Sequence, residues 1–333
     1  MTSRDLEQAR RLLCALQDHI RDALVQARKK QASSFARVAA VTAADTIYHI
    51  DRLSEHAILD WFARHWPKAW PVEVVMEGLE EHGAVTFPRG TPVAATMLKC
   101  ILDPIDGTRN IMYDKRSAWI LGALAPQRGA KTNLDDILVA AMTEIPTSKQ
   151  WRSDQLSAVH GRGVRAEAVD VFTGKRTKLL IKPSSARECR GGFAAISRFF
   201  PEGKTLLASI EERLWDELYG LGKQASPLVF DDQYICTGGQ LYELIIGHDR
   251  FLADLRPLVF RKLKLNSALV CHPYDICTVL IAREAGCIIE APLGGKLDQP
   301  LDTTSAVAWA GYANPALARH IRPVLHRLIR QKL

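Results

Sequence analysis

Residues 97–108 read MLKCILDPIDGT, an apolar run followed by two aspartates. The apolar half predicts a buried strand, and Asp103 and Asp106 follow it directly, three residues apart. A buried carboxylate without a partner is costly, so this pair predicts either ion pairs or a bound metal. Carboxylate oxygens suit Mg²⁺, which usually takes one or two of them together with water and phosphate oxygens.

The residues around the two aspartates favour a ligand-binding turn. Pro104 stiffens the exit from the strand, and Gly107 allows the backbone to approach a ligand closely. Thr108 adds a hydroxyl and a backbone N–H, and a helix that begins here would favour an anion such as phosphate. The alternative is a turn whose aspartates only cap a helix, and the complete hexapeptide argues against it.

The first 160 residues or so predict two helices followed by a sheet. Apolar residues recur at helical spacing over 4–30 and 43–66, and Pro67 ends the second helix. Short apolar or alternating runs then predict the strands of one antiparallel or mixed sheet. These strands cover 72–76, 95–102, 118–125, 138–143 and 157–160.

After about residue 180 strand-like and helical runs alternate, which is typical of a layered α/β arrangement. The predicted strands cover 192–197, 234–237, 250–254, 287–290 and 306–310. The predicted helices cover 203–219, 239–247, 274–285 and 314–331. The polar stretch 173–188 predicts a boundary between an N-terminal half, 1–180, and a C-terminal half, 181–333.

Composition is that of a globular protein, since 47% of the 333 residues are hydrophobic and 24% are charged. No uncharged apolar run reaches the roughly 18 residues that a membrane span needs. The 7 cysteines are irregularly spaced, without a Cys-x-x-Cys pair, and the first helix is charged throughout. We therefore expect reduced core thiols in a cytoplasmic protein.

The net charge of +7 raises the question of nucleic acid as a partner. The basic residues are scattered, and no basic stripe with interleaved aromatic residues occurs, so we expect no nucleic-acid partner and no membrane partner. A mild attraction for anionic, phosphorylated substrates fits the same charge. The absence of a Gly-x-x-x-x-Gly-Lys-Ser/Thr loop argues against a P-loop NTPase.

Residues 103–111, DPIDGTRNI, resemble the DPxDGTxNF signature of the inositol monophosphatase superfamily. That superfamily includes inositol monophosphatases, archaeal-type fructose-1,6-bisphosphatases and 3′-phosphoadenosine 5′-phosphate phosphatases. Three further segments match in the expected order. Residues 272–287 resemble WDxAA…EAGG, residues 74–77 resemble a strand that ends in a metal-binding Glu, and residues 41–45 resemble VTxxD.

The resemblance implies a layered αβαβα sandwich of the sugar-phosphatase type, with an N-terminal α+β half and a C-terminal α/β half. It implies a Mg²⁺-dependent phosphatase for a small phosphorylated polyol or sugar, similar above all to an inositol monophosphatase. Three alternatives stay open: a fructose-1,6-bisphosphatase, a 3′-phosphoadenosine 5′-phosphate phosphatase, and a phosphate-binding relative without turnover. A homodimer and inhibition by Li⁺ are further implications.

The resemblance also implies a ligand set for two or three Mg²⁺ ions. Asp103 would bridge two ions, and Glu77 together with the carbonyl of Ile105 would complete the first site. Asp106 and Asp275 would hold the second ion.

Water activation is assigned by the same resemblance. Asp45 and Thr108 would orient the attacking water, and Glu77 would contribute to catalysis as a metal ligand. Glu77 is preferred because it directly follows the apolar run, and Glu80 and Glu81 are the alternatives.

Substrate contacts follow from two segments. The N–H groups of Gly107 and Thr108 would bind the phosphate. Gly239 and Gln240 lie in a segment that resembles the family's GSxAL and would form the substrate pocket. These two residues and Arg256, in a DxR-like strand, are the positions where substrate choice would differ.

Overall fold

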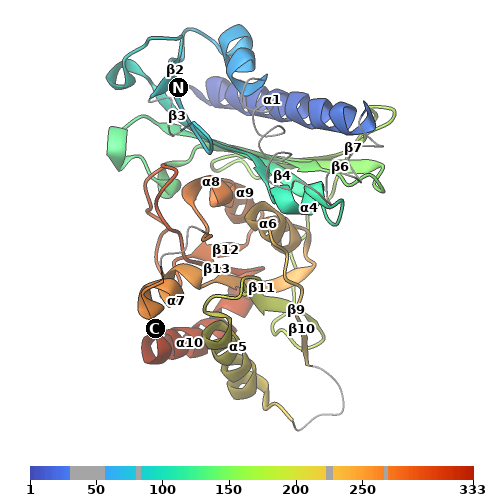
Figure 1. The fold of residues 1–333 in the computed structure, drawn as a ribbon, viewed down its shortest axis with the longest axis vertical. Helices are drawn as coiled ribbons and strands as arrows, with labels where there is room; N and C mark the ends of the chain where they lie inside the picture. Colours follow the sequence, from blue (N-terminus) through green and yellow to red (C-terminus); the bar gives the residue numbers. More distant parts are fainter. Residues whose placement is uncertain (31–56, 80–83, 223–227, 266–268) are drawn as a thin grey trace.

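The computed structural model describes residues 1–30, 57–79, 84–222, 228–265 and 269–333. Helices and two sheets alternate in five layers, as Figure 1 shows. The predicted αβαβα layering is thereby confirmed. Within these residues, the search for a helix with the length and hydropathy of a membrane span finds none.

The first sheet has eight strands in the order β2-β1-β3-β4-β5-β6-β7-β8. Neighbouring strands are antiparallel, except that β1 and β3 are parallel. The strands are β1 (Val72–Met76), β2 (Val85–Phe87), β3 (Leu98–Asp106), β4 (Ala118–Pro126), β5 (Val139–Ile145), β6 (Arg152–Val159), β7 (Val164–Asp170) and β8 (Arg176–Lys178).

The second sheet has five strands in the order β10-β9-β11-β13-β12. Strand β9 is parallel to both β10 and β11, whereas β13 is antiparallel to both β11 and β12. The strands are β9 (Gly192–Ile196), β10 (Val229–Phe230), β11 (Asp249–Asp254), β12 (Ile288–Glu290) and β13 (Trp309–Tyr312).

Helices form the other three layers (Figure 1). Helix α1 covers the outer face of the first sheet, α6, α8 and α9 lie between the sheets, and α5 and α10 cover the outer face of the second sheet. The helices are α1 (Ser3–Lys30), α4 (Thr108–Met112), α5 (Lys204–Tyr219), α6 (Thr237–Ile246), α7 (Arg256–Leu263), α8 (Pro273–Ile276), α9 (Val279–Glu284) and α10 (Pro315–Lys332). Short 3-10 turns occur at Val93–Ala95, Gly129–Lys131 and Leu134–Asp136.

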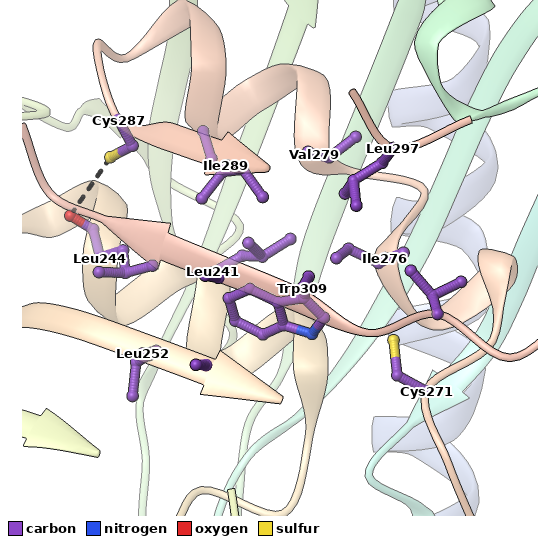
Figure 2. Close-up of a cluster of buried hydrophobic side chains, with 14 of the residues drawn as sticks. Leu241, Leu244, Leu252, Cys271, Ile276, Val279, Cys287, Ile289, Leu297 and Trp309 are labelled. Atoms are coloured by element: carbon purple, nitrogen blue, oxygen red, sulfur yellow. Dashed lines mark hydrogen bonds between the residues drawn. The ribbon is translucent and has the colours of Figure 1, made fainter. Parts of the chain in front are cut away.

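The core between the sheets explains why the middle helices hold their places. In α6, Leu241, Leu244 and Ile245 recur at helical spacing and are fully buried. Figure 2 shows the first two of them close to Trp309 of β13, whose indole is also fully buried. Burying each such side chain contributes about 1.5–3 kcal/mol. All seven cysteines are free and buried, as predicted.

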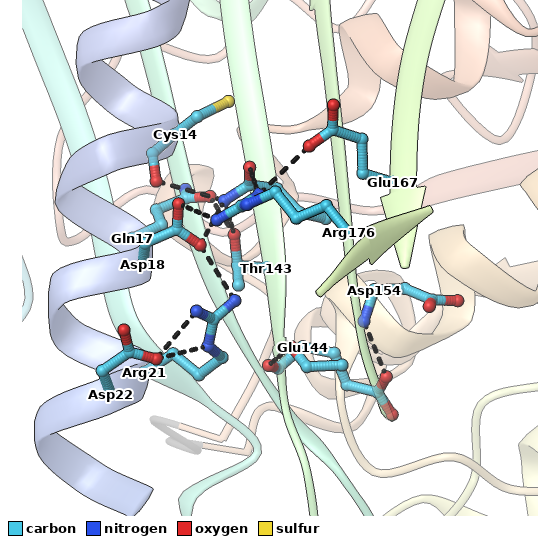
Figure 3. Close-up of polar contacts among 12 residues, drawn as sticks. Cys14, Gln17, Asp18, Arg21, Asp22, Thr143, Glu144, Asp154, Glu167 and Arg176 are labelled. Atoms are coloured by element: carbon cyan, nitrogen blue, oxygen red, sulfur yellow. Dashed lines mark hydrogen bonds and ion pairs between the residues drawn. The ribbon is translucent and has the colours of Figure 1, made fainter. Parts of the chain in front are cut away.

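Polar side chains fix α1 on the first sheet, in the region shown in Figure 3. Gln17 is fully buried, and its Nε2 donates a hydrogen bond to the carbonyl of Ala141 at 2.7 Å. Its Oε1 accepts a hydrogen bond from the Thr143 hydroxyl at 2.8 Å. At the solvent edge of the same contact, Arg176 of β8 pairs with Asp18 at 2.5 Å.

We expect Gln17→Leu to lower the free energy of unfolding by about 1–3 kcal/mol, because it leaves buried groups of Ala141 and Thr143 with fewer partners. Urea unfolding of the purified protein measures the change. Gln8→Leu, at an exposed position of the same helix, is the matched control and should shift stability by less than about 0.5 kcal/mol. Equal effects of the two variants would contradict the stabilising role of the buried hydrogen bonds of Gln17.

Two predicted elements of the C-terminal half are wrong. Residues 234–237 do not form a strand, because Cys236 is the N-cap of α6 and its Sγ accepts a hydrogen bond from the Gly239 N–H. The predicted helix 274–285 is two short helices, α8 and α9, separated at Cys277–Thr278.

Three strands of the first sheet were not predicted from the sequence: β2, which has only three residues, β7 and β8. Strand β7 alternates only weakly, and all three residues of β8 are exposed, so neither carries a strong apolar pattern. Strand β8 also lies inside the stretch 173–188 that was predicted as the boundary between halves. The division into 1–180 and 181–333 stays a prediction. The helix predicted at 43–66 is described only over 57–65, where the chain is helical.

Candidate metal centre

The aspartates of DPIDGT lie at the end of β3, between strands β1 and β4. The register of β3 against β4 shifts between Asp103 and Asp106, so the strand is irregular where its carboxylates stand. Both residues are buried, with 2% and 7% of their surface exposed. Oδ1 of Asp103 accepts a hydrogen bond from the N–H of Ile105 at 2.9 Å, which fixes the turn.

Gly107 makes the turn from β3 into α4. Its φ of 90° lies in the left-handed region that favours glycine, and a Cβ there would stand 3.1 Å from Cβ of Cys236. After the turn, the Thr108 hydroxyl donates a hydrogen bond to the carbonyl of Ile105 at 2.9 Å. Helix α4 therefore begins beside the carboxylates, as the sequence suggested.

The start of α6 holds Asp106. The N–H of Gly238 donates a hydrogen bond to Oδ2 of Asp106 at 2.5 Å. A Cβ at Gly238 would lie 2.6 Å from Cδ2 of Leu121 and 3.1 Å from the same carboxylate oxygen. A larger residue here would have to displace the Leu121 side chain and crowd the Asp106 carboxylate.

Asp275 reaches the same place from the C-terminal half. It stands in the first turn of α8, where Pro273 occupies an early helical position, and the N–H of His272 donates to its Oδ2 at 2.6 Å. Asp103, Asp106 and Asp275 each present an oxygen, and these oxygens lie within 4.8 Å of one another. Segments about 170 residues apart in sequence thus form one cluster.

Burial and mutual repulsion raise the pKa values of the β3 aspartates. Burial raises the pKa of Asp103 well above its ordinary range, and the charges of Asp106, Asp275 and Glu77 raise it further. Burial and then Asp275 raise the pKa of Asp106 to about 8, against the lowering effect of its hydrogen bond from Gly238. Within the described ranges, no lysine or arginine forms an ion pair with these three aspartates.

The donor set fits a divalent cation. Three converging carboxylates carry negative charge into a buried site, and a bound cation would balance that charge. All three offer oxygen atoms, which are the ligands of hard ions such as Mg²⁺.

Glu77 follows β1 near the cluster, but it is not one of the three carboxylates that converge within 4.8 Å. Strand β1 pairs with β3 in parallel, and Met76 stands opposite Leu102, so the next residues along the two strands are Glu77 and Asp103. Glu77 lines the same cavity as the aspartates. The alternatives Glu80 and Glu81, and the predicted water-orienting Asp45, lie outside the described residues.

A cavity of about 240 Å³ opens over the carboxylates. Its size suits a small molecule rather than a polymer. Its walls come from both halves of the chain: Glu77, Asp103, Ile105–Arg109, Phe199, Phe200, Ile235–Thr237, Arg256 and Leu269–Asp275 without Pro273. Five of the predicted site residues, Glu77, Ile105, Gly107, Thr108 and Asp275, are therefore brought together with the β3 aspartates.

Gly239 and Gln240 do not line this cavity. Nε2 of Gln240 donates to the Ser197 hydroxyl at 2.9 Å, and a Cβ at Gly239 would overlap the ring of Tyr234. Their neighbours Cys236 and Thr237 line the cavity instead.

The sequence analysis missed the aromatic wall of the cavity. Phe199 and Phe200 line it together with His272, whose ring stacks on Tyr274 with centroids 5.3 Å apart. The pair of phenylalanines follows β9 in a segment without periodicity, so no local pattern marks it. His272 stands inside the quoted segment 272–287 and could have been noted there.

Comparison with known proteins identifies the fold. No family model matches this sequence, and no curated protein matches it. Among solved structures, the chain is similar to Mycobacterium tuberculosis SuhB, with a TM-score of 0.58 and 15% sequence identity. The match covers 98% of this chain and 97% of that chain. At this identity the similarity establishes the fold: a layered sandwich of the sugar-phosphatase type, as predicted.

Proposed function

We propose that this protein is a Mg²⁺-dependent phosphatase that hydrolyses the phosphate monoester of a small polyol or sugar, in the manner of an inositol monophosphatase. The observation that carries the proposal is the convergence of Asp103, Asp106 and Asp275 beneath a small cavity. The fold adds support, because SuhB is a protein of the inositol monophosphatase family.

The residues of the site have distinct parts in this proposal. Asp103, Asp106 and Asp275, with Glu77 and the carbonyl of Ile105, would hold two or three Mg²⁺ ions. When bound, Mg²⁺ polarises phosphoryl oxygens and lowers the pKa of coordinated water. The hydrogen bonds from the N–H groups of Ile105, Gly238 and His272 keep the carboxylates in place for this task.

Phosphate and water would be positioned by the turn after β3. The N–H groups of Gly107 and Thr108 stand at the start of α4, beside the carboxylates, where a phosphate oxygen can accept from them. The Thr108 hydroxyl, tied to Ile105, would orient the attacking water together with Asp45.

Gly239 and Gln240 would shape the substrate pocket indirectly. They hold the α6 turn, whose residues Cys236 and Thr237 face the cavity.

A substrate panel tests the proposal. Phosphate release is measured with inositol 1-phosphate, fructose 1,6-bisphosphate, 3′-phosphoadenosine 5′-phosphate and glycerol 2-phosphate, each with and without Mg²⁺. We expect turnover only with Mg²⁺ and a preference for inositol 1-phosphate. A preference for another ester would assign the protein to that branch. No turnover by folded protein at saturating Mg²⁺ would contradict the proposal and favour a phosphate-binding relative.

Three further properties belong to the same proposal. By resemblance to the family, we propose a cytoplasmic homodimer whose activity is inhibited by Li⁺. The seven free, buried cysteines are compatible with a reducing compartment. Light scattering at micromolar concentration would measure the oligomeric state, and Li⁺ titration of the panel would measure inhibition.

A further inference from the structure

Arg256 is a buried cation in the wall of the cavity, yet it is already paired. It begins α7, one residue after the end of β11, and only 5% of its surface is exposed. Its Nε and Nη2 donate to the two carboxylate oxygens of Asp254 at 2.9 and 2.5 Å. This two-point pair neutralises the guanidinium and fixes its plane.

The same guanidinium joins three segments that line the cavity. It lies 4.4 Å from the ring centroid of Phe199 and 5.3 Å from that of Phe200. Its Nη1 donates to the carbonyl of Leu269 at 2.9 Å, on the segment that leads to Asp275. Arg256 therefore ties the chain after β9 to the end of β11 and to the segment before α8.

The lining of the cavity combines two kinds of chemistry. Carboxylates line it, and beside Arg256 it presents the apolar side chains of Phe199, Phe200 and Leu269. Among the described lining residues, the lysine and arginine side chains are those of Arg109 and Arg256 alone. Because the carboxylate of Asp254 balances the charge of Arg256, this wall suits a neutral group of the substrate rather than a second phosphate.

We propose that Arg256 is a positioning residue that holds Phe199 and Phe200 as a wall, against which the neutral, ring-shaped organic part of a monophosphate ester packs. The proposal rests on the proposed phosphatase function and specifies its substrate class. Aromatic rings in a cavity offer a rigid apolar surface, and a guanidinium stacked on a ring fixes its orientation. The phosphate would remain beside the carboxylates in every variant of the wall.

Phe199→Leu tests the wall without disturbing the Asp254–Arg256 pair. Michaelis kinetics are measured with inositol 1-phosphate, which has a ring, and glycerol 2-phosphate, which has none. We expect KM for inositol 1-phosphate to rise about 10-fold, with kcat within about 3-fold of wild type, because the lost contact binds substrate and transition state alike. KM for glycerol 2-phosphate should change less than about 3-fold.

Arg256→Lys tests the positioning role. Lysine keeps the charge but loses the two-point pair and the planar stack, so its effect should have the same direction and the same substrate dependence as that of Phe199→Leu. Mn²⁺ binding measured by electron paramagnetic resonance should equal that of the wild type in both variants. Phe193→Leu is the matched control, since this exposed phenylalanine of β9 does not line the cavity.

The outcomes separate this inference from the function on which it rests. Equal changes with both esters, or a loss of kcat at unchanged KM, would overturn the positioning role while wild-type turnover upholds the phosphatase. Absence of wild-type turnover on every ester would overturn the phosphatase and this inference with it. A selective rise in KM for the ring-containing ester in both variants, absent in Phe193→Leu, supports the inference.

Discussion

Asp103→Asn should lower Mg²⁺-dependent phosphate release by about 1,000-fold or more. Asp103 is one of the three converging carboxylates, with an oxygen within 4.8 Å of oxygens from both Asp106 and Asp275. Removing its charge weakens the binding of every ion the cluster would hold. Metal ions supply several kcal/mol of transition-state stabilisation, and each 1.4 kcal/mol or so is a factor of ten in rate.

The same substitution should stabilise the metal-free protein at pH 7.5. Burial and three neighbouring carboxylates raise the pKa of Asp103, so the ionised side chain opposes folding. Asparagine is neutral and can still accept the hydrogen bond from the Ile105 N–H. We expect the free energy of unfolding to rise by on the order of 1 kcal/mol, measured by urea denaturation in chelator.

A loss of turnover combined with a gain in stability would show that the Asp103 carboxylate serves function rather than the fold. Asp60→Asn makes the same chemical change at an exposed ion pair with Arg64, and it should alter neither quantity measurably. Near wild-type turnover of Asp103→Asn would contradict the role of the cluster. A large loss of stability in chelator would instead show that the carboxylate serves the fold.

The parts of the fold that were predicted correctly are those with strong local patterns. Strand β3 is an apolar run of the type that becomes a buried central strand, and α1 has an apolar face at helical spacing. Strand β8 has no buried residue, and its only strand partner among the described residues is β7. Such an edge strand depends on its neighbour, which lies outside any local window of sequence.

The site residues that were predicted also lie in segments with strong local patterns. DPIDGT carries its own turn chemistry, so Asp103 and Asp106 could be selected from the sequence. Glu77 was selected because it directly follows an apolar run, and its role as a ligand stays a prediction. The sequence analysis did not predict the partner of Asp106 on α6. The N–H that reaches this carboxylate is that of Gly238, and backbone groups leave no signature in residue type.

The aromatic wall was missed for a different physical reason. Phe199 and Phe200 reach the cavity because Arg256 and the second sheet bring their segment there. That placement is a property of packing between β9 and β11, whose pairing is parallel and non-local. The residues of such a wall are identified from the structure, whereas a turn that carries carboxylates, such as DPIDGT, can be recognised in the sequence.

Mg²⁺ should stabilise the protein more at pH 8 than at pH 5. The pKa of Asp106 is raised to about 8 in the folded protein, above its ordinary value of 3.8. The folded state therefore binds more protons than the unfolded state between these values, and the free energy of unfolding of the metal-free protein falls as pH rises from about 4 to about 8. Protons and Mg²⁺ compete for the same oxygens, so metal binding strengthens over the same range.

Thermal unfolding with Mg²⁺, or with NaCl at equal ionic strength, measures this linkage. At free Mg²⁺ 100 times its Kd, the expected stabilisation is about 2.7 kcal/mol, and it should nearly vanish at pH 5. Other buried carboxylates titrate as well: burial raises the pKa of Asp249, which does not line the cavity, to about 7. Asp249→Asn should therefore weaken the pH dependence of the free energy of unfolding but keep the stabilisation by Mg²⁺. Asp106→Asn should weaken the same pH dependence and also abolish the stabilisation by Mg²⁺. A Mg²⁺ response that is equal at both pH values, or that persists in Asp106→Asn, would mean that the ion binds elsewhere.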